Sequence, residues 1–249
     1  MTNDISRRGE MVDAIDSNSI LSNKVLVQVR SSASFLETAA LVCFDFDGLL
    51  VDTEPLHYRA YTEACAAYKI PLKLDFPSYQ AIANHARGNL LEEFVLKKYP
   101  NFTKPWEEVR VHTKELYRSF LQKSGAPLMP GVEEILSFLL KKKTPLCVVT
   151  NSVEKEIALI LPHTPCLKAI PLWITKERYD KRKPAPDGYL TAKAHFPDIP
   201  KERVIGFEDS LKGLQALQAA EILPILVARD KPSLPPNVHY FPSLTSMVM

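Results

Sequence analysis

The sequence predicts an α/β protein in which a parallel sheet is covered by helices and interrupted early by an all-helical insertion. From residue 130 onward, short apolar runs alternate with helical segments of about 10–15 residues, which is the pattern of βαβ units. Residues 41–46 (LVCFDF) form an earlier β-favouring apolar run, as expected of a central parallel strand. Between these two regions, residues 55–123 carry only helical spacing, so we expect them to form a separate unit.

The composition narrows the class of protein. The 249 residues include 31 Lys and Arg against 29 Asp and Glu, a net charge of +2. A nucleic-acid-binding or membrane-surface protein would normally carry a basic excess, so we expect neither partner. The longest apolar run, residues 39–44, is far shorter than the roughly 18 residues that a membrane-spanning helix needs.

The N-terminal segment is predicted to stand apart from the fold. Residues 1–23 are polar and aperiodic, which is typical of a flexible tail, whereas residues 24–30 (KVLVQVR) alternate enough to form a strand. The segment lacks the apolar stretch of a signal peptide and is too acidic for a transit peptide. We expect a cytoplasmic protein whose cysteines, which show no paired metal-ligand spacing, are reduced thiols: Cys43, Cys65, Cys147 and Cys166.

The remaining elements follow in order along the chain. Apolar residues three to four positions apart predict helices over residues 55–70, 89–99 and 105–123, with Pro55 and Pro105 in their first turns. The later strands are expected at residues 145–150, 172–175, 203–207 and 224–228, with 238–241 as a further candidate. The helices between them are expected at residues 132–142, 152–161, 185–196 and 210–220.

Polar residues follow the strands of this predicted sheet. Ligands of such sheets bind outside the carboxyl ends of the strands. Four polar segments lie there, and their coincidence is the strongest functional signal in the sequence: residues 45–48, 150–152, the region before Lys183-Pro184, and 208–210.

The first of these segments contains two carboxylates. Asp45 and Asp47 are two positions apart, so on an extended backbone their side chains point to the same side. Such a pair suits a division of labour between an ionised nucleophile or metal ligand and a proton donor. Gly48 follows where the chain leaving the strand would need an unusual φ. The alternative is that these aspartates simply occupy a turn.

The second segment has two interpretations. Asn151 and Glu154 could form a helix N-cap with its capping-box partner. Alternatively, the Thr150 hydroxyl and the exposed backbone N–H groups at the start of this helix could bind a phosphate. The segment alone does not decide between them.

The last two segments add a cation and two acids. Lys181 and Arg182 are expected on a solvated face, whereas Lys183 has its backbone fixed by the prolines that follow it. Asp209 could be only an N-cap, but acids such as Glu208 and Asp209 at the end of a buried strand are costly unless they bind something.

Charge balance connects the four segments. With Asp45 and Asp209 ionised the site holds two negative charges, and a phosphate monoester adds up to about two more. A divalent cation and Lys183 would return three positive charges, which an attacking carboxylate needs in order to approach an anionic phosphoryl group. Carboxylate oxygens suit Mg²⁺, the cofactor that we therefore expect.

The motifs DFDGLLVDTEP, TNS, KPAPD and GFEDSLKG, in this order, closely resemble those of the haloacid dehalogenase-like (HAD) superfamily. The resemblance covers residues 39–229 and is strongest to the β-phosphoglucomutase/phosphoglycolate phosphatase-like branch. It implies a Rossmann-like core with helices on both faces, from residues 39–52 and 126–249, and a helical cap at 53–125. Residues 1–38 form an extension without a counterpart. Glu221 departs from the family, which commonly has Gly there.

The resemblance also implies a role for each motif residue. Asp45 would be the nucleophile that forms an aspartyl-phosphate, Asp47 the general acid/base, and Lys183 the cation that stabilises the phosphoryl charge. Thr150 and Asn151 would bind that phosphoryl group. The Mg²⁺ ligands would be Asp45, the Asp47 carbonyl and Asp209, with Glu208 a ligand or just behind the ligands.

These residues favour a phosphatase that hydrolyses a small phosphorylated metabolite, acting as a monomer. A phosphomutase of the β-phosphoglucomutase type stays open as the alternative. A dehalogenase would not need an acid at Asp47, since no alkoxide leaves, and the intact catalytic set argues against a silent binding module.

The helical cap should select the substrate. We expect Arg87 to fork onto a second phosphate or sugar oxygens, and His57 is a second candidate contact. His85, Gly88 and Asn89 surround Arg87 and are expected to be loop residues, while Trp106 and Trp173 are expected to pack.

Overall fold

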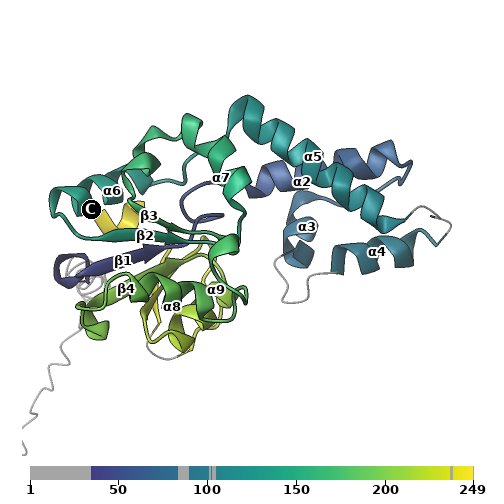
Figure 1. Cartoon of the computed structure of the whole chain (residues 1–249). Helices are drawn as coiled ribbons and strands as arrows, with labels where there is room; N and C mark the ends of the chain where they lie inside the picture. The colour runs from purple at the N-terminus through teal and green to yellow at the C-terminus, as the bar shows by residue number, and fades with distance from the viewer. Residues whose placement is uncertain (1–34, 84–89, 101, 103–104, 236–237, 249) are drawn as a thin grey trace, which may run out of the picture.

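The computed structural model describes residues 35–83, 90–100, 102, 105–235 and 238–248 (Figure 1). The predicted N-terminal tail and the predicted strand at residues 24–30 lie outside these ranges. Within them, no helix is long and apolar enough to cross a membrane.

The sheet has six parallel strands in the order β3-β2-β1-β4-β5-β6. Every predicted strand of the described part is present, and the run at residues 41–46 supplies the central strand, as predicted. Cys43 of this strand is in register with Cys147 on one side and Gly206 on the other. The strands are β1 (Leu41–Phe44), β2 (Leu146–Val149), β3 (Leu172–Ile174), β4 (Val204–Glu208), β5 (Leu223–Val227) and β6 (His239–Phe241).

Helices cover both faces of the sheet, as predicted (Figure 1). Successive side chains of a strand point to opposite faces. Val42 and Phe44 of β1 therefore join the cluster that includes α6 and α7, whereas Leu41 and Cys43 join the cluster that includes α8 and α9. The helices are α6 (Val132–Lys141), α7 (Glu154–Ile160), α8 (Asp187–Ala194), α9 (Leu211–Ala219) and α10 (Thr245–Val248), with 3₁₀ turns at Leu161–His163, Pro165–Ala169, Lys176–Arg178 and Lys201–Arg203.

Four helices inserted between β1 and α6 lie to one side of the sheet (Figure 1). They are α2 (Glu54–Ala67), α3 (Phe76–Ala83), α4 (Leu90–Lys98) and α5 (Trp106–Ser124), and we call them the helical insert. A hydrophobic cluster of their own holds them together, with Tyr61, Cys65, Val95 and Val109 at its centre. The three helices predicted here are present, and α3 is an additional one.

Both prolines start helices, but in different positions. Pro55 lies in the first turn of α2, as predicted, whereas Pro105 is the N-cap of α5, one residue before the helix begins. Pro lacks an N–H, and it can occupy a helix start because the first N–H groups have no intrahelical partner.

Candidate functional site

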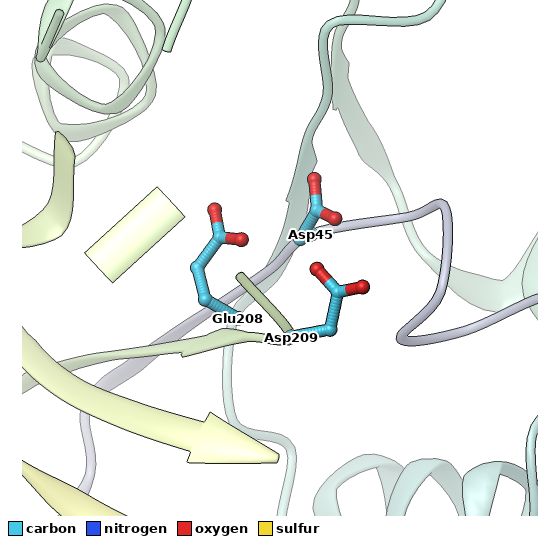
Figure 2. A group of neighbouring side chains, drawn as sticks. All are labelled: Asp45, Glu208 and Asp209. Atoms are coloured by element: carbon cyan, nitrogen blue, oxygen red, sulfur yellow. The ribbon is translucent and has the colours of Figure 1, made fainter. Parts of the chain in front are cut away.

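The carboxyl ends of β1, β2 and β4 lie at one edge of the sheet, where they bring together most of the polar residues singled out in the sequence. Asp45 follows β1, Thr150 follows β2, and Glu208 and Asp209 lie at the end of β4. Figure 2 shows the three carboxyl groups of this edge side by side.

Lys183 links two of these carboxylates. Its ammonium donates hydrogen bonds to Asp45 Oδ1 at 2.6 Å, to Glu208 Oε1 at 2.6 Å and to the Val149 carbonyl at 2.7 Å. The Tyr189 hydroxyl also donates to Glu208 Oε1, and its ring lies 4.9 Å from Lys183 Nζ. The Lys183 and Glu208 side chains are almost fully buried, so their charges are held in place and poorly screened.

The pKa values show an excess of negative charge. Burial, with a further contribution from Glu208, raises the pKa of Asp45 to about 7 even though Lys183 opposes the shift. Burial, then Asp45 and Glu208, raises the pKa of Asp209 well above its usual value. Burial alone would lower the pKa of Lys183, but the neighbouring carboxylates raise it. One ammonium therefore does not balance these acids.

The acidic cluster fits a divalent cation. Asp45, Glu208 and Asp209 can each offer an oxygen within 4.8 Å of the others (Figure 2). Glu208 Oε2 is buried without a hydrogen-bond partner among the described residues. A cation here would lower the pKa values that burial and mutual repulsion raise, and a set made only of oxygens suits Mg²⁺. Lys183 engages one oxygen of Asp45 and one of Glu208, so each of these carboxylates keeps its second oxygen for a cation.

A glycine lets the loop after β1 approach this cluster. Gly48 has φ +79°, as its position predicted, and a Cβ there would lie 2.1 Å from Asp209 Oδ2. Both the backbone conformation and the space therefore require Gly.

Asp47 has different surroundings from Asp45. Its carboxylate accepts hydrogen bonds from three hydroxyl groups: Thr53 Oγ1 at 2.8 Å, Ser152 Oγ, and Thr150 Oγ1 at 3.4 Å. No described lysine or arginine pairs with it within 4 Å. The two aspartates are thus separated chemically, one beside an ammonium and the other among hydroxyls.

The capping interpretation of the second segment is wrong. Helix α7 has Val153 at its N-cap, with no side-chain cap bond, and the N–H of Glu154 donates to the Glu177 carboxylate at 3.2 Å. Asn151 Oδ1 instead accepts from the Tyr179 hydroxyl at 2.8 Å and from the Lys183 N–H at 3.1 Å. Asn151 thereby ties the end of β2 to the backbone of Lys183.

The same correction applies at α9. Ser210, not Asp209, is the N-cap residue, and its Oγ accepts from the Gly213 N–H at 3.2 Å. The Asp209 carboxylate is therefore left for the acidic cluster.

The helical insert brings His57 toward the site. Its ring stacks on Tyr117 with 3.8 Å between ring centroids, and burial lowers its pKa although Asp47 opposes the shift. It lines a cavity of about 560 Å³ between the insert and the loop that carries Arg182. Arg182 is exposed, as predicted, but it faces this cavity rather than open solvent alone.

The other expected insert residues have mixed outcomes. Arg87 and its neighbours His85, Gly88 and Asn89 lie outside the described residues. Trp106 packs against Tyr61 and also lines the cavity, and Trp173 packs edge-on against Phe46. Packing is thus confirmed for both tryptophans.

Three residues of the site were missed in the sequence, and a fourth, Ser152, was noted only as part of the polar segment 150–152. Thr53 and Ser152 bind Asp47, Tyr179 binds Asn151, and Tyr189 binds Glu208. Thr53 and Ser152 lie within the DTEP and TNS motifs, so their position in a motif could have indicated that they belong to the site. Nothing in the pattern marks either tyrosine, because their contacts depend on how the loop before α8 folds back.

Glu54 is a further acid near the site. Burial, then Asp47 and Asp52, raises its pKa, and its Oε2 has no hydrogen-bond partner among the described residues.

Known proteins are similar to this chain in sequence and in fold. The model of the haloacid dehalogenase-like hydrolase family matches residues 39–221. A phosphorylated carbohydrates phosphatase of Thermotoga maritima is 30% identical over 186 residues, or 73% of this chain and 81% of that protein. Beta-phosphoglucomutase of Bacillus subtilis is 24% identical over 199 residues, or 78% and 85% of the two chains. The structure of CbbY from Rhodobacter sphaeroides with phosphate superposes with a TM-score of 0.65 at 22% identity, covering 83% of this chain and 95% of that one.

Proposed function

Since this chain belongs to the haloacid dehalogenase-like hydrolase family, we propose that it is a magnesium-dependent phosphatase of a small phosphorylated metabolite, acting through an aspartyl-phosphate. The observation that carries the proposal is the contrast between Asp45, beside Lys183 and the acidic cluster, and Asp47, among hydroxyl groups. Two carboxylates in such different surroundings suit two different tasks.

Asp45 is the proposed nucleophile. A carboxylate oxygen of Asp45 attacks the phosphorus, and the bond from phosphorus to the leaving-group oxygen breaks. The Lys183 ammonium, 2.6 Å from Asp45 Oδ1, favours the ionised nucleophile and offers positive charge to the phosphoryl oxygens. Water then attacks the phosphorus of the aspartyl-phosphate, which frees inorganic phosphate and regenerates Asp45.

Asp47 is the proposed general acid/base. In the first step it gives a proton to the departing oxygen, and in the second it takes a proton from the attacking water. The hydroxyls of Thr53 and Ser152 hold its carboxylate in one orientation. Thr150 and Asn151, at the end of β2, are proposed to bind the phosphoryl oxygens.

The residues that would hold Mg²⁺ are Asp45, the Asp47 carbonyl and Asp209, with Glu208 a ligand or just behind the ligands. When bound, the ion neutralises negative charge on the carboxylates and on the phosphoryl group.

We propose that residues 53–125, which include the helical insert, act as a cap that selects the leaving group, while residues 39–52 and 126–249 form the core. His57 and the cavity that it lines face the site from this side. We further propose a monomer acting in the cytoplasm, where its four cysteines stay reduced; all four are free thiols.

A phosphomutase is the second candidate. One relative is named beta-phosphoglucomutase, and a mutase must hold a second phosphate while the first is transferred. Cations in the cavity beside His57, Arg110 and Lys114 among them, could do so. Hydrolysis is preferred because the relative with the higher identity is named a phosphatase.

The test is phosphate release from a panel of sugar, polyol and nucleoside monophosphates, with p-nitrophenyl phosphate as a general substrate. We expect activity with Mg²⁺, its loss in excess chelator and its recovery when Mg²⁺ is restored. Ca²⁺ should substitute poorly because its bonds are longer and its coordination number higher. Full activity in excess chelator would show that the reaction needs no metal ion. Absence of phosphate release from every ester would overturn the proposed function.

A further inference from the structure

We propose that the leaving group of the substrate carries a second anionic group, which Lys114 of the helical insert and Arg182 of the sheet domain hold together. The inference rests on the proposed function and narrows its substrate class. It starts from the cavity of about 560 Å³ between the helical insert and the loop before α8, a volume within the usual range for a small-molecule site.

The cavity opens beside the catalytic groups. Arg182 directly precedes Lys183, whose ammonium binds Asp45. His57, which lines the cavity from α2 of the helical insert, is close enough to Asp47 for the Asp47 charge to act on its pKa. A phosphate ester bound at Asp45 would therefore have its leaving group directed at this cavity.

The cavity is lined by aromatic side chains and by several cations. Tyr61, Tyr79 and Trp106 line the interior of the insert. The charged residues that line the cavity are Glu92, Arg110, Lys114 and Arg182, so cations outnumber the single carboxylate. Burial lowers the pKa of His57, so it adds little positive charge at neutral pH.

Two of these cations have no protein partner in the part of the chain that the structure describes. Arg110 pairs with Glu107 one turn earlier on α5. Lys114 and Arg182, by contrast, form no ion pair within 4 Å and no side-chain hydrogen bond with the described residues. Glu156, the acid whose pKa responds to Lys114, is already paired with Arg118 at 3.1 Å.

Lys114 and Arg182 come from different parts of the fold. Lys114 is on α5 of the insert, whereas Arg182 precedes α8 of the sheet domain. An anion held by both would bridge insert and sheet over the reacting phosphoryl group. Lys183 and the proposed Mg²⁺ already provide positive charge for the reacting phosphoryl group. Lys114 and Arg182 are therefore available to bind a different anion.

The chemistry of the second anion follows from its two partners. An Arg guanidinium can fork onto two oxygens of a phosphate or a carboxylate, and a Lys ammonium binds either as a point charge. The substrate is therefore a phosphate monoester with a second phosphate or a carboxylate at its far end. Two matched pairs of substrates distinguish a second phosphate from a carboxylate.

The experiment compares kcat/KM for each pair. Glucose 1,6-bisphosphate is matched with glucose 1-phosphate, and 2-phosphoglycolate with 2-hydroxyethyl phosphate, each with Mg²⁺ present. We expect the doubly anionic member of at least one pair to be preferred about 10- to 100-fold, the range for hydrogen bonds to charged groups. The pair that shows the preference identifies the second group as phosphate or carboxylate.

The variants Arg182→Gln and Lys114→Gln test the assignment. Each should raise KM for the preferred substrate by about tenfold or more and affect its matched partner and p-nitrophenyl phosphate only a few-fold. Lys181→Gln and Lys123→Gln are the controls, since they remove cations from the same loop and the same helix that do not line the cavity. The controls should leave the preference intact.

The outcomes separate this inference from the proposed function. Equal efficiency within both pairs, or a uniform loss across all substrates in the two variants, would overturn the inference while phosphatase activity remained. Absence of phosphate release from every substrate, p-nitrophenyl phosphate included, would overturn the function and the inference together.

Discussion

Asp45 and Asp47 have the same side chain and lie two residues apart, yet the fold gives them opposite surroundings. Asp45 ends a buried strand and binds the Lys183 ammonium, and burial raises its pKa to about 7. Asp47 lies in the loop beyond it and accepts hydrogen bonds from hydroxyl groups. The difference comes from the segments that each side chain meets: the loop that carries Lys183 for Asp45, and Thr53 with the residues just after β2 for Asp47.

Replacing the proposed nucleophile should remove turnover. Asp45→Asn keeps the shape of the side chain but lacks the ionised oxygen that attacks phosphorus. We expect kcat to fall by at least about 10³-fold, as for other nucleophile replacements. Steady-state phosphate release measures this, and circular dichroism checks the fold, which should persist because the change also reduces repulsion with Glu208 and Asp209. Near-normal activity would mean that another group attacks.

Replacing the proposed acid/base should discriminate between leaving groups. Asp47→Asn removes a proton donor that typically contributes roughly 10²–10⁴-fold. Alkyl phosphates should lose activity to this extent, whereas p-nitrophenyl phosphate should lose much less, because p-nitrophenolate needs little protonation. Comparing kcat/KM for the two substrates gives the result. Equal losses on both would indicate that Asp47 is structural.

At the residue scale, the acids were predictable because they follow apolar runs within recognisable motifs. Lys183 was predictable because the prolines after it fix its backbone within another such motif. Tyr189 was not, since its hydroxyl meets Glu208 only after α8 packs on the sheet. The charged neighbours of Arg182 predicted that it lies on a solvated face. That it also lines a cavity follows from the packing of the helical insert, which the sequence does not show.

At the scale of single elements, the residue that follows α9 has an unfavourable backbone conformation. Glu221, just after the helix, has φ +55°, in the left-handed region that favours Gly. Its carboxylate pairs with Lys201 at 2.8 Å, but both side chains are mostly exposed, so the pair contributes little. This is the position at which the family resemblance led us to expect Gly.

Glu221→Gly should therefore stabilise the protein. We expect the midpoint of thermal unfolding to rise by about 1–3 °C, since relief of the backbone outweighs the lost surface pair and the added freedom of the unfolded chain. Glu221→Ala is the matched control, because it removes the same pair and keeps the unfavourable backbone. An equal rise in the Ala variant would attribute the effect to the side chain instead.

Strands and helices of the sheet domain were predictable because their apolar periods are clear and their ends are polar. Helix α3 (Phe76–Ala83) was not identified in the sequence, although it packs into the hydrophobic cluster of the helical insert. Its eight residues include a proline and four apolar side chains, and a stretch this short shows little period by itself. Contacts of Tyr79 with Tyr58 and Tyr61 fix it in place.

At the scale of the whole molecule, we expect the position of the helical insert to decide whether water or a second hydroxyl receives the phosphoryl group. A mutase must exclude water while a bisphosphate reorients under the insert. We expect hydrolysis, so β-glucose 1-phosphate with a trace of the 1,6-bisphosphate should yield free phosphate, and no more glucose 6-phosphate than hydrolysis of the added bisphosphate can give. Net conversion to glucose 6-phosphate with little free phosphate would identify a mutase instead.

The order of strands was not accessible from the sequence, because the apolar runs do not say which strand lies beside which. That order puts the ends of β1, β2 and β4 together and so assembles Asp45, Thr150 and Asp209. The motifs predicted the members of the site, and the topology brought them into contact.

The most direct test of the proposed chemistry is chemical trapping of the phosphorylated enzyme. Borohydride reduces an acyl phosphate to an alcohol, so an aspartyl-phosphate at Asp45 would be recovered as homoserine in a peptide analysed by mass spectrometry. We expect this product at Asp45 only when a substrate and Mg²⁺ are both present, and never in Asp45→Asn. Steady phosphate release without a reduced Asp45, or reduction at Asp47 or Asp209 instead, would contradict the assignment of the nucleophile.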